Sequence, residues 1–152
     1  MFRGATKVTL DDKGRTVMPT RFREQISVLS QGKLVITVSI DREQCLLIYP
    51  LPDWEETERK LMALPSLHPQ ARRLQRLMVG HATDLELDGH GRFLLPPELR
   101  EFAHLDRHGM LVGQGNRIEL WDETRWKEQR DQWLKSEDTL TDLPDGFDTL
   151  SL

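Results

Sequence analysis

Hydrophobic and polar positions along the first fifty residues change their period twice. The segment ATKVTL (5–10) alternates, a four-residue polar turn follows, and GRTVMP (14–19) reads as a return strand. Two further β-rich runs, KLVITVSI (33–40) and EQCLLIYP (43–50), predict a second hairpin. Between the hairpins the apolar residues fall at helical spacing, after a proline suited to the first helical position, in the set Pro19, Phe22, Ile26 and Leu29. Residues 1–52 are therefore predicted to fold as strand, strand, helix, strand, strand.

The same pattern returns later in the chain. The stretch LDDKGRTVMPTRFRE (10–24) has a near copy in LDGHGRFLLPPELRE (87–101), and Asp11 and Asp88 are 88 − 11 = 77 positions apart. The second unit, residues 81–121, predicts strands at 82–87, 91–95, 109–114 and 117–121 and a short helix from Pro97. Four short strands cannot easily bury a core alone, so we expect the two halves to share one. The predicted fold class is α+β and β-rich, with two tandem repeats in one pseudo-two-fold barrel.

Helices are expected to link and flank the repeats. In residues 53–80, Asp53 is a predicted N-cap with Glu56 three residues on, and a second helix is predicted from Pro69 to Gly80. Residues 122–135 predict a C-terminal helix capped by Asp122 and carrying Trp126 and Trp133. The remainder, 136–152, is an acidic tail that we expect to be mobile.

Charge is distributed unevenly along the chain, which has 152 residues and a formal net charge of −4. Basic side chains dominate residues 1–23, whereas acidic ones dominate 136–152. Because salt screens charges over about 8–10 Å, a local basic face can still bind phosphate. The lone Cys45 lies in an apolar run and reads as a buried hydrophobe. No signal peptide or membrane-length apolar run is evident, so the expected location is cytoplasmic.

The repeated turns are the candidate functional site. Asp11 and Asp88 can accept hydrogen bonds from loop N–H groups, and Gly14 and Gly91 allow the positive φ that such turns need. Turn geometry does not need the arginine that both copies retain, and a guanidinium suits phosphate or guanine O6 and N7. A two-stranded β-ribbon can enter the major groove. We therefore predict that the turns bind double-stranded DNA, through Arg15, Lys13, Arg3, Lys7 and Arg92. The two aspartates are expected to support the turns and to hold the arginines in register.

The two turns differ in charge. Lys13 of the first copy corresponds to His90 of the second, and Arg21 corresponds to Glu98. The first turn is more basic, so we expect it to dominate contact with DNA.

These motifs carry a resemblance to a known family. The stretches MFRG, LDDKGR, PTRFRE, LLIYPLPDWEETERKL, LDGHGRFLLPPELRE and LVGQGNRIELWDE resemble the MraZ family of bacterial transcriptional regulators, which are relatives of the AbrB-type swapped-hairpin barrels. The resemblance covers at least residues 1–134. It implies two AbrB-like repeats, each with a D-x-x-x-R motif, at 11–15 and 88–92. It also implies a ring-shaped homo-oligomer, associated with the nucleoid. Such a ring would bind G-rich direct repeats upstream of its own gene and repress the division and cell-wall cluster.

Other classes of function fit the sequence less well. A proton-sharing pair of Asp11 and Asp88 would need burial, whereas these turns are polar and basic. No catalytic triad, phosphate loop, cofactor motif or small-molecule site is evident, and His104 and His108 lack a third metal ligand. We therefore expect neither catalysis nor a cofactor. The alternative is a protein-interaction module that uses Arg72, Arg73 and Arg76 together with the acidic tail.

Overall fold

A computed structural model of the chain describes residues 1–136 and 145–151. In the described part, strands β1 (Ala5–Thr9), β3 (Lys33–Val38), β4 (Leu46–Pro50), β5 (Thr83–Glu86), β7 (His108–Gly113) and β8 (Ile118–Asp122) form an antiparallel sheet. Strands β2 (Arg15–Val17) and β6 (Arg92–Leu94) pair in a separate two-stranded sheet. The expected α+β, β-rich class is confirmed. The prediction of a mobile tail concerns mainly residues 137–144 and 152, which lie outside the described residues.

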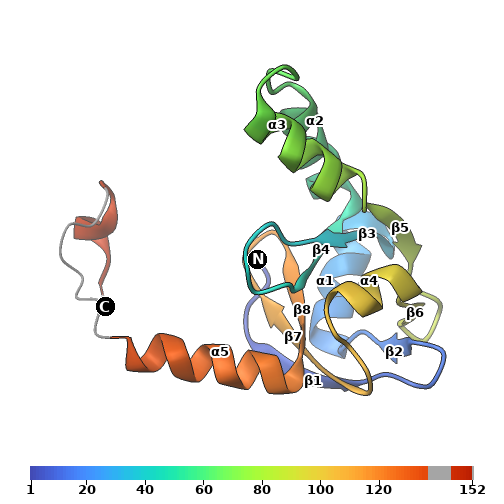
Figure 1. Cartoon of the computed structure of the whole chain (residues 1–152). Coiled ribbons are helices and arrows are strands. Elements are labelled where there is room, and N and C mark those ends of the chain that lie inside the picture. The colour runs from blue at the N-terminus through green and yellow to red at the C-terminus, as the bar shows by residue number, and fades with distance from the viewer. Residues whose placement is uncertain (137–144, 152) are drawn as a thin grey trace.

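The strand order of the large sheet, β1-β7-β8-β4-β3-β5, is symmetric about its centre. Exchanging the two repeats replaces β1 with β5, β7 with β3 and β8 with β4, and leaves the order unchanged. The central contact is the β4–β8 pair, in which Leu46 faces Leu120 and Ile48 faces Ile118. The β2–β6 sheet completes the barrel beside β1 and β5 (Figure 1). The predicted pseudo-two-fold arrangement of the halves is therefore present.

Pairing of the first strands corrects one prediction. Residues 5–19 were expected to form a hairpin, but β1 pairs with β7, and β2 pairs with β6. The expected tight turn between β1 and β2 is present, since Gly14 N–H donates to Asp11 O at 3.0 Å. Each strand leaves this turn toward a different partner in the other repeat. The hairpins β3–β4 and β7–β8 are formed as predicted.

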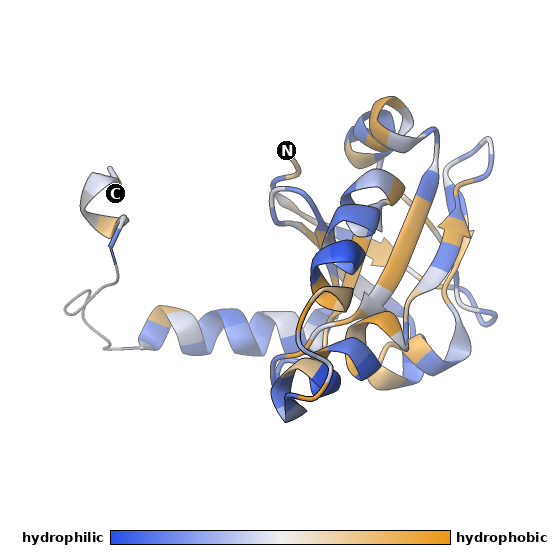
Figure 2. Ribbon diagram, turned by 90° about the horizontal axis from the view of Figure 1, so that it is seen from above, coloured by the Kyte–Doolittle hydropathy of each residue, from blue (hydrophilic) through white to orange (hydrophobic). Residues whose placement is uncertain are grey.

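Exchange of strands explains why one core serves both repeats. The barrel interior is filled by fully buried side chains from the first repeat (Leu10, Met18, Phe22, Ile26, Leu34, Ile36, Leu46 and Ile48) and from the second (Leu95, Leu111, Ile118 and Leu120). Apolar residues at alternate positions of the same strands face outward and form a second cluster with Trp54 and Trp121. Because strands β3, β4 and β7 are buried on both faces, their sequences are nearly continuous apolar runs (Figure 2).

Short helices follow the strands that carry the turns. Helix α1 (Thr20–Ser30) has Pro19 as its N-cap rather than its first residue. In the second repeat, α4 (Pro97–Phe102) begins at Pro97 as predicted. Both helices bury apolar residues in the barrel core, through Phe22 and Ile26 in α1 and Leu99 in α4.

The linking segment forms a helical pair that stands above the barrel (Figure 1). Helix α2 (Leu51–Met62) begins directly at the end of β4, with Pro50 at its N-cap, so the predicted Asp53 cap is wrong. Proline at the second helical position starts this helix earlier than a side-chain cap would. Helix α3 (Pro69–Leu74) passes into a π-helical turn, η1 (Gln75–Val79), whose Met78 carbonyl accepts a hydrogen bond from the Thr37 hydroxyl at 2.5 Å. The α3–η1 segment is thereby fixed to β3.

Helix α5 (Glu123–Lys135) extends away from the barrel (Figures 1 and 2). Its predicted cap is confirmed, because Asp122 Oδ2 accepts from Arg125 N–H at 3.1 Å. Trp126 and Trp133 pack edge-to-face with each other and with the buried Trp121, at centroid distances of 5.4–6.1 Å. A short 3-10 helix, η2 (Phe147–Thr149), lies near the C-terminus. Within the described residues, no helix is long and apolar enough to cross a membrane.

Candidate nucleic-acid interface

Both D-x-x-x-R turns have the same hydrogen-bond geometry. Asp11 Oδ1 accepts from the backbone N–H groups of Lys13 and Arg15, each at 2.9 Å. Asp88 Oδ1 accepts from those of His90 at 2.8 Å and Arg92 at 2.9 Å. The glycine of each turn has positive φ, +86° at Gly14 and +77° at Gly91. The structure therefore places the aspartates and glycines in the turn-supporting positions that the sequence indicates.

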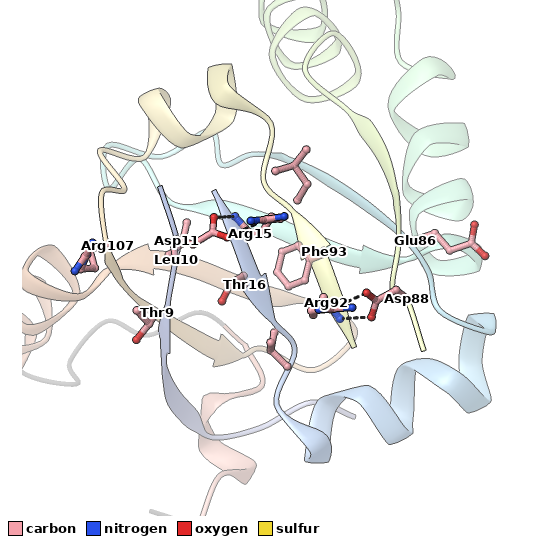
Figure 3. A pocket seen from close by; sticks show the side chains of 12 residues that line it. Thr9, Leu10, Asp11, Arg15, Thr16, Glu86, Asp88, Arg92, Phe93 and Arg107 are labelled. Carbon is pink, nitrogen blue, oxygen red and sulfur yellow. Dashed lines mark hydrogen bonds and ion pairs between the residues drawn. The ribbon is translucent and has the colours of Figure 1, made fainter. Parts of the chain in front are cut away.

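Each aspartate also holds its arginine. Arg15 Nε donates to Asp11 Oδ2 at 2.7 Å, and Arg92 Nε donates to Asp88 Oδ2 at 2.8 Å. In the described part of the chain, no group accepts from the Nη atoms of these two arginines, and both side chains are more than half exposed. The carboxylate occupies the Nε edge of each guanidinium (Figure 3). Because the side chains are exposed, the two terminal amino groups remain accessible to a partner.

The same hydrogen bonds set the ionisation of the aspartates. The hydrogen bonds that Asp11 accepts from Arg15 lower the pKa of Asp11 below its usual value. The backbone hydrogen bond has the larger effect and the side-chain hydrogen bond the next. The backbone hydrogen bond of Arg92 leads a set of contacts that lower the pKa of Asp88 to about 2. A proton-sharing carboxylate pair would need one raised pKa. The two aspartates are instead both stabilised as anions.

The β2–β6 sheet brings the two turns onto one surface. Arg15 lies directly opposite Leu94, and Val17 lies opposite Arg92. Since side chains alternate across a strand, these four point outward while Thr16 and Phe93 are buried behind them. An open groove runs over this face and is lined by residues of both motifs, including Asp11, Arg15, Asp88 and Arg92 (Figure 3).

Two arginines that sequence reasoning did not assign to this role support the turns from behind. Arg100 Nη1 donates to the carbonyl of Asp12 at 3.3 Å, and its other nitrogens donate to Leu105 O and Asp106 O. At the matching position of the first repeat, Arg23 packs against Gly91, where a Cβ would lie 2.6 Å from Arg23 Cδ. The repeat supplies the signal for this role, since Arg23 and Arg100 are also 77 positions apart.

Other predicted contacts are placed differently. Lys13 belongs to the first turn and is exposed. Lys7 lies on β1 and pairs with Glu123 Oε2 of α5 at 3.0 Å, away from the groove. Arg3 follows the bridge between Phe2 and Gly115, beside the β7–β8 turn. The structure thus joins Arg15, Lys13 and Arg92 at one surface but not Arg3 or Lys7. It adds Arg107, which lines the groove and contacts Asp12 at 3.5 Å.

The other reactive groups that the structure describes do not form a site. Burial raises the pKa of Cys45 to about 12, so its thiol is not a nucleophile at neutral pH. Among the described residues, no cluster of three or more potential metal ligands is present.

The three arginines of the alternative module, Arg72, Arg73 and Arg76, are exposed on α3 and η1, opposite the buried Ala71 and Met78. An amphipathic helix accounts for this pattern without a partner.

Comparison with known proteins identifies the duplicated unit. A family model described as "MraZ protein, putative antitoxin-like" matches residues 1–77 and matches again over 78–144. The chain belongs to the MraZ family. A MraZ relative from Thioalkalivibrio sulfidiphilus is 53% identical over 152 residues, the full length of both chains. Another, from Azotobacter vinelandii, is 58% identical over 126 residues, covering 83% of this chain and 82% of the relative. Both bear the name "Transcriptional regulator MraZ", which names a regulator rather than an enzyme.

Proposed function

We propose that this chain is a sequence-specific DNA-binding transcriptional regulator whose β2–β6 sheet docks on duplex DNA. The observation that carries this proposal is the presence of two arginines, each held by an aspartate, on the exposed face of one two-stranded sheet. The curated MraZ relatives are named as transcriptional regulators, which supports the same function. A two-stranded ribbon has the width that the major groove of B-DNA admits.

Guanine is the base that this geometry fits best. A guanidinium that is held at Nε and free at both Nη atoms can donate two parallel hydrogen bonds to guanine O6 and N7. The aspartate fixes the plane of the fork before binding, so less side-chain entropy is lost on contact. We therefore propose that the chain reads G-rich repeats, with Arg15 and Arg92 on guanine edges and Lys13 on phosphate.

A single sheet of this size makes few phosphate contacts and would bind weakly. Several chains in one assembly, each on its own DNA repeat, would gain affinity through effective concentration. A head-to-tail homo-oligomer closes into a ring when its rotation divides the circle. We propose such a ring on direct repeats upstream of the chain's own gene, where binding would repress the division and cell-wall gene cluster.

The test is a footprint of the full-length protein on the DNA upstream of its own gene, with its mass measured in solution. Arg15→Ala should fold and assemble like the parent but bind about 5- to 150-fold more weakly, the range for one bidentate guanine contact. Arg72→Ala removes the same charge from α3, far from the turns, and should bind like the parent. If Arg15→Ala binds this DNA as well as the parent, the proposed interface is wrong.

A further inference from the structure

We infer that Val17 and Leu94, which lie directly opposite the two arginines, contact the 5-methyl group of thymine and so determine sequence specificity beside the guanines. This inference rests on the proposed function, since it concerns the same DNA-binding face. Thymine is the base that presents a methyl group in the major groove, and aliphatic side chains are its natural contacts there.

Position in the sheet makes each aliphatic side chain the direct neighbour of an arginine. Leu94 is the cross-strand partner of Arg15, and Val17 is the partner of Arg92. Directly opposed residues in an antiparallel pair have Cβ atoms about 4.5–5.5 Å apart. Successive base pairs stack about 3.4 Å apart. A side chain beside a guanine-bound arginine therefore reaches the next one or two base pairs.

The two aliphatic side chains are exposed at matching positions of the two repeats. Val17 is 49% exposed and Leu94 is 50% exposed, and each has an arginine directly opposite it on the neighbouring strand. They also occupy matching positions of the two repeats, since 94 − 17 = 77. Single exposed aliphatic residues are common and need no explanation. Here both strands of the ribbon have the same order of residues: an arginine, then a buried residue, then an exposed aliphatic residue.

The charges around this apolar pair select its partner. Arg15 and Arg92 lie opposite the two aliphatic side chains, and Arg107 lines the same groove. The acidic side chains of the groove are Glu86 and the two aspartates that pair with Arg15 and Arg92. A purely apolar partner surface would leave the guanidinium groups without acceptors, whereas a DNA groove offers phosphates, guanine acceptors and thymine methyl groups together.

The experiment compares the duplex footprinted upstream of the gene with a series of variants of the same duplex. In one series each thymine is replaced singly by uracil, which removes only the 5-methyl group. The parent protein should lose about three- to fivefold in affinity at one or more thymines, the factor expected for one buried methyl. Equal affinity for the thymine and uracil duplexes at every position would overturn the inference.

Variants assign the contact to the two residues. Val17→Thr replaces one methyl by a hydroxyl and keeps the β-branched shape, and Leu94→Thr retains strand propensity. Each should bind the thymine duplex more weakly than the parent and lose discrimination at its own thymine. Val28→Thr is the matched control on α1, where the side chain is 88% exposed, and should retain full discrimination. If Val17→Thr and Leu94→Thr discriminate thymine from uracil as the parent does, the inference fails.

Failure of this inference is distinguishable from failure of the proposed function. If Arg15→Ala loses binding while every uracil duplex binds the parent normally, the interface is correct and only the methyl contact is wrong. The dependence of affinity on salt reports phosphate contacts, so its slope should be the same for Val17→Thr, Leu94→Thr and the parent. A reduced slope would mean that the substitutions displace the whole face, which contradicts a local methyl contact.

Discussion

Arg100 in helix α4 donates a hydrogen bond to the backbone carbonyl of Asp12, at 3.3 Å and across 88 residues of sequence. The first charged turn is thus held by a helix of the second repeat. Symmetry places Arg23 of α1 behind the second turn, packed against Gly91. Each charged turn is therefore positioned by the repeat to which it does not belong.

Removing this support should reduce DNA affinity without removing a DNA contact. We expect Arg100→Ala to weaken binding about tenfold, because the first turn loses the hydrogen bond that fixes Asp12 and its neighbours. Arg23→Ala should have the smaller effect, because the second turn is less basic. The test is the DNA affinity of both variants at one fixed salt concentration. Arg72→Ala is the control that removes an equal charge. A larger loss for Arg23→Ala would assign the main contact to the second turn.

Gly14→Ala tests the conformation of the first turn. The glycine has φ +86°, and an added Cβ would lie 3.1 Å from Leu95 O, which directly follows β6 of the second repeat. The left-handed conformation costs an alanine about 1–2 kcal/mol, and the close carbonyl adds to that cost. Urea unfolding should show a loss of at least this size. Gly89→Ala, in the second turn, meets no atom within 4 Å and should be nearly neutral.

Asp88 should contribute to the acid dependence of stability. Its folded pKa of about 2 lies below the unfolded value of 3.8, so its contribution is present above pH 3.8 and is lost as the pH falls toward 2. We expect the melting temperature of Asp88→Asn to fall less steeply than that of the parent over this interval. Parallel curves would show that the carboxylate is not stabilised by the turn.

Thr16 is buried behind the ribbon, and its hydroxyl has no hydrogen-bond partner among the described residues. Replacing it with valine removes an unsatisfied polar group and preserves the side-chain shape. Thr16→Val should therefore increase the free energy of unfolding by about 1 kcal/mol, measured by urea denaturation. DNA affinity should not change, because the side chain faces away from the groove; a change would indicate that Thr16 contributes to the binding face.

Trp126 holds the extended helix α5 to the barrel. The helix has no buried residue, and Trp126 makes edge-to-face contacts with Trp121 and Trp133. Trp126→Ala removes two such pairs and should cost about 1–3 kcal/mol. The near-ultraviolet circular dichroism of Trp126→Ala should be weaker than that of the parent, because only the Trp121–Trp133 pair remains, whereas Lys135→Ala at the end of the helix should retain the full signal. An unchanged spectrum would mean that α5 is fixed by its other contacts.

Several elements were predictable because their causes are local in the chain. The turn of Asp11 closes its hydrogen bonds within five residues, so aspartate, glycine and arginine at fixed spacing were enough to place it. The cap at Asp122 is equally local and was also correct. The N-terminus of α2 was misplaced, since a strand that ends in Pro50 leads into the helix without the side-chain cap that Asp53 suggested.

The sequence by itself determined the duplication, the chemistry of the turns and the succession of strands and helices, because spacing and alternation are properties of neighbouring residues. Only the tertiary structure decided that β2 pairs with β6 rather than β1, and that Arg15, Val17, Arg92 and Leu94 therefore share one face. It also separated Lys7 from that face by pairing it with Glu123. Alternation shows that a strand has an apolar side but not which strand lies beside it. Which strand pairs with it depends on how two segments that are distant in the sequence together bury that apolar side.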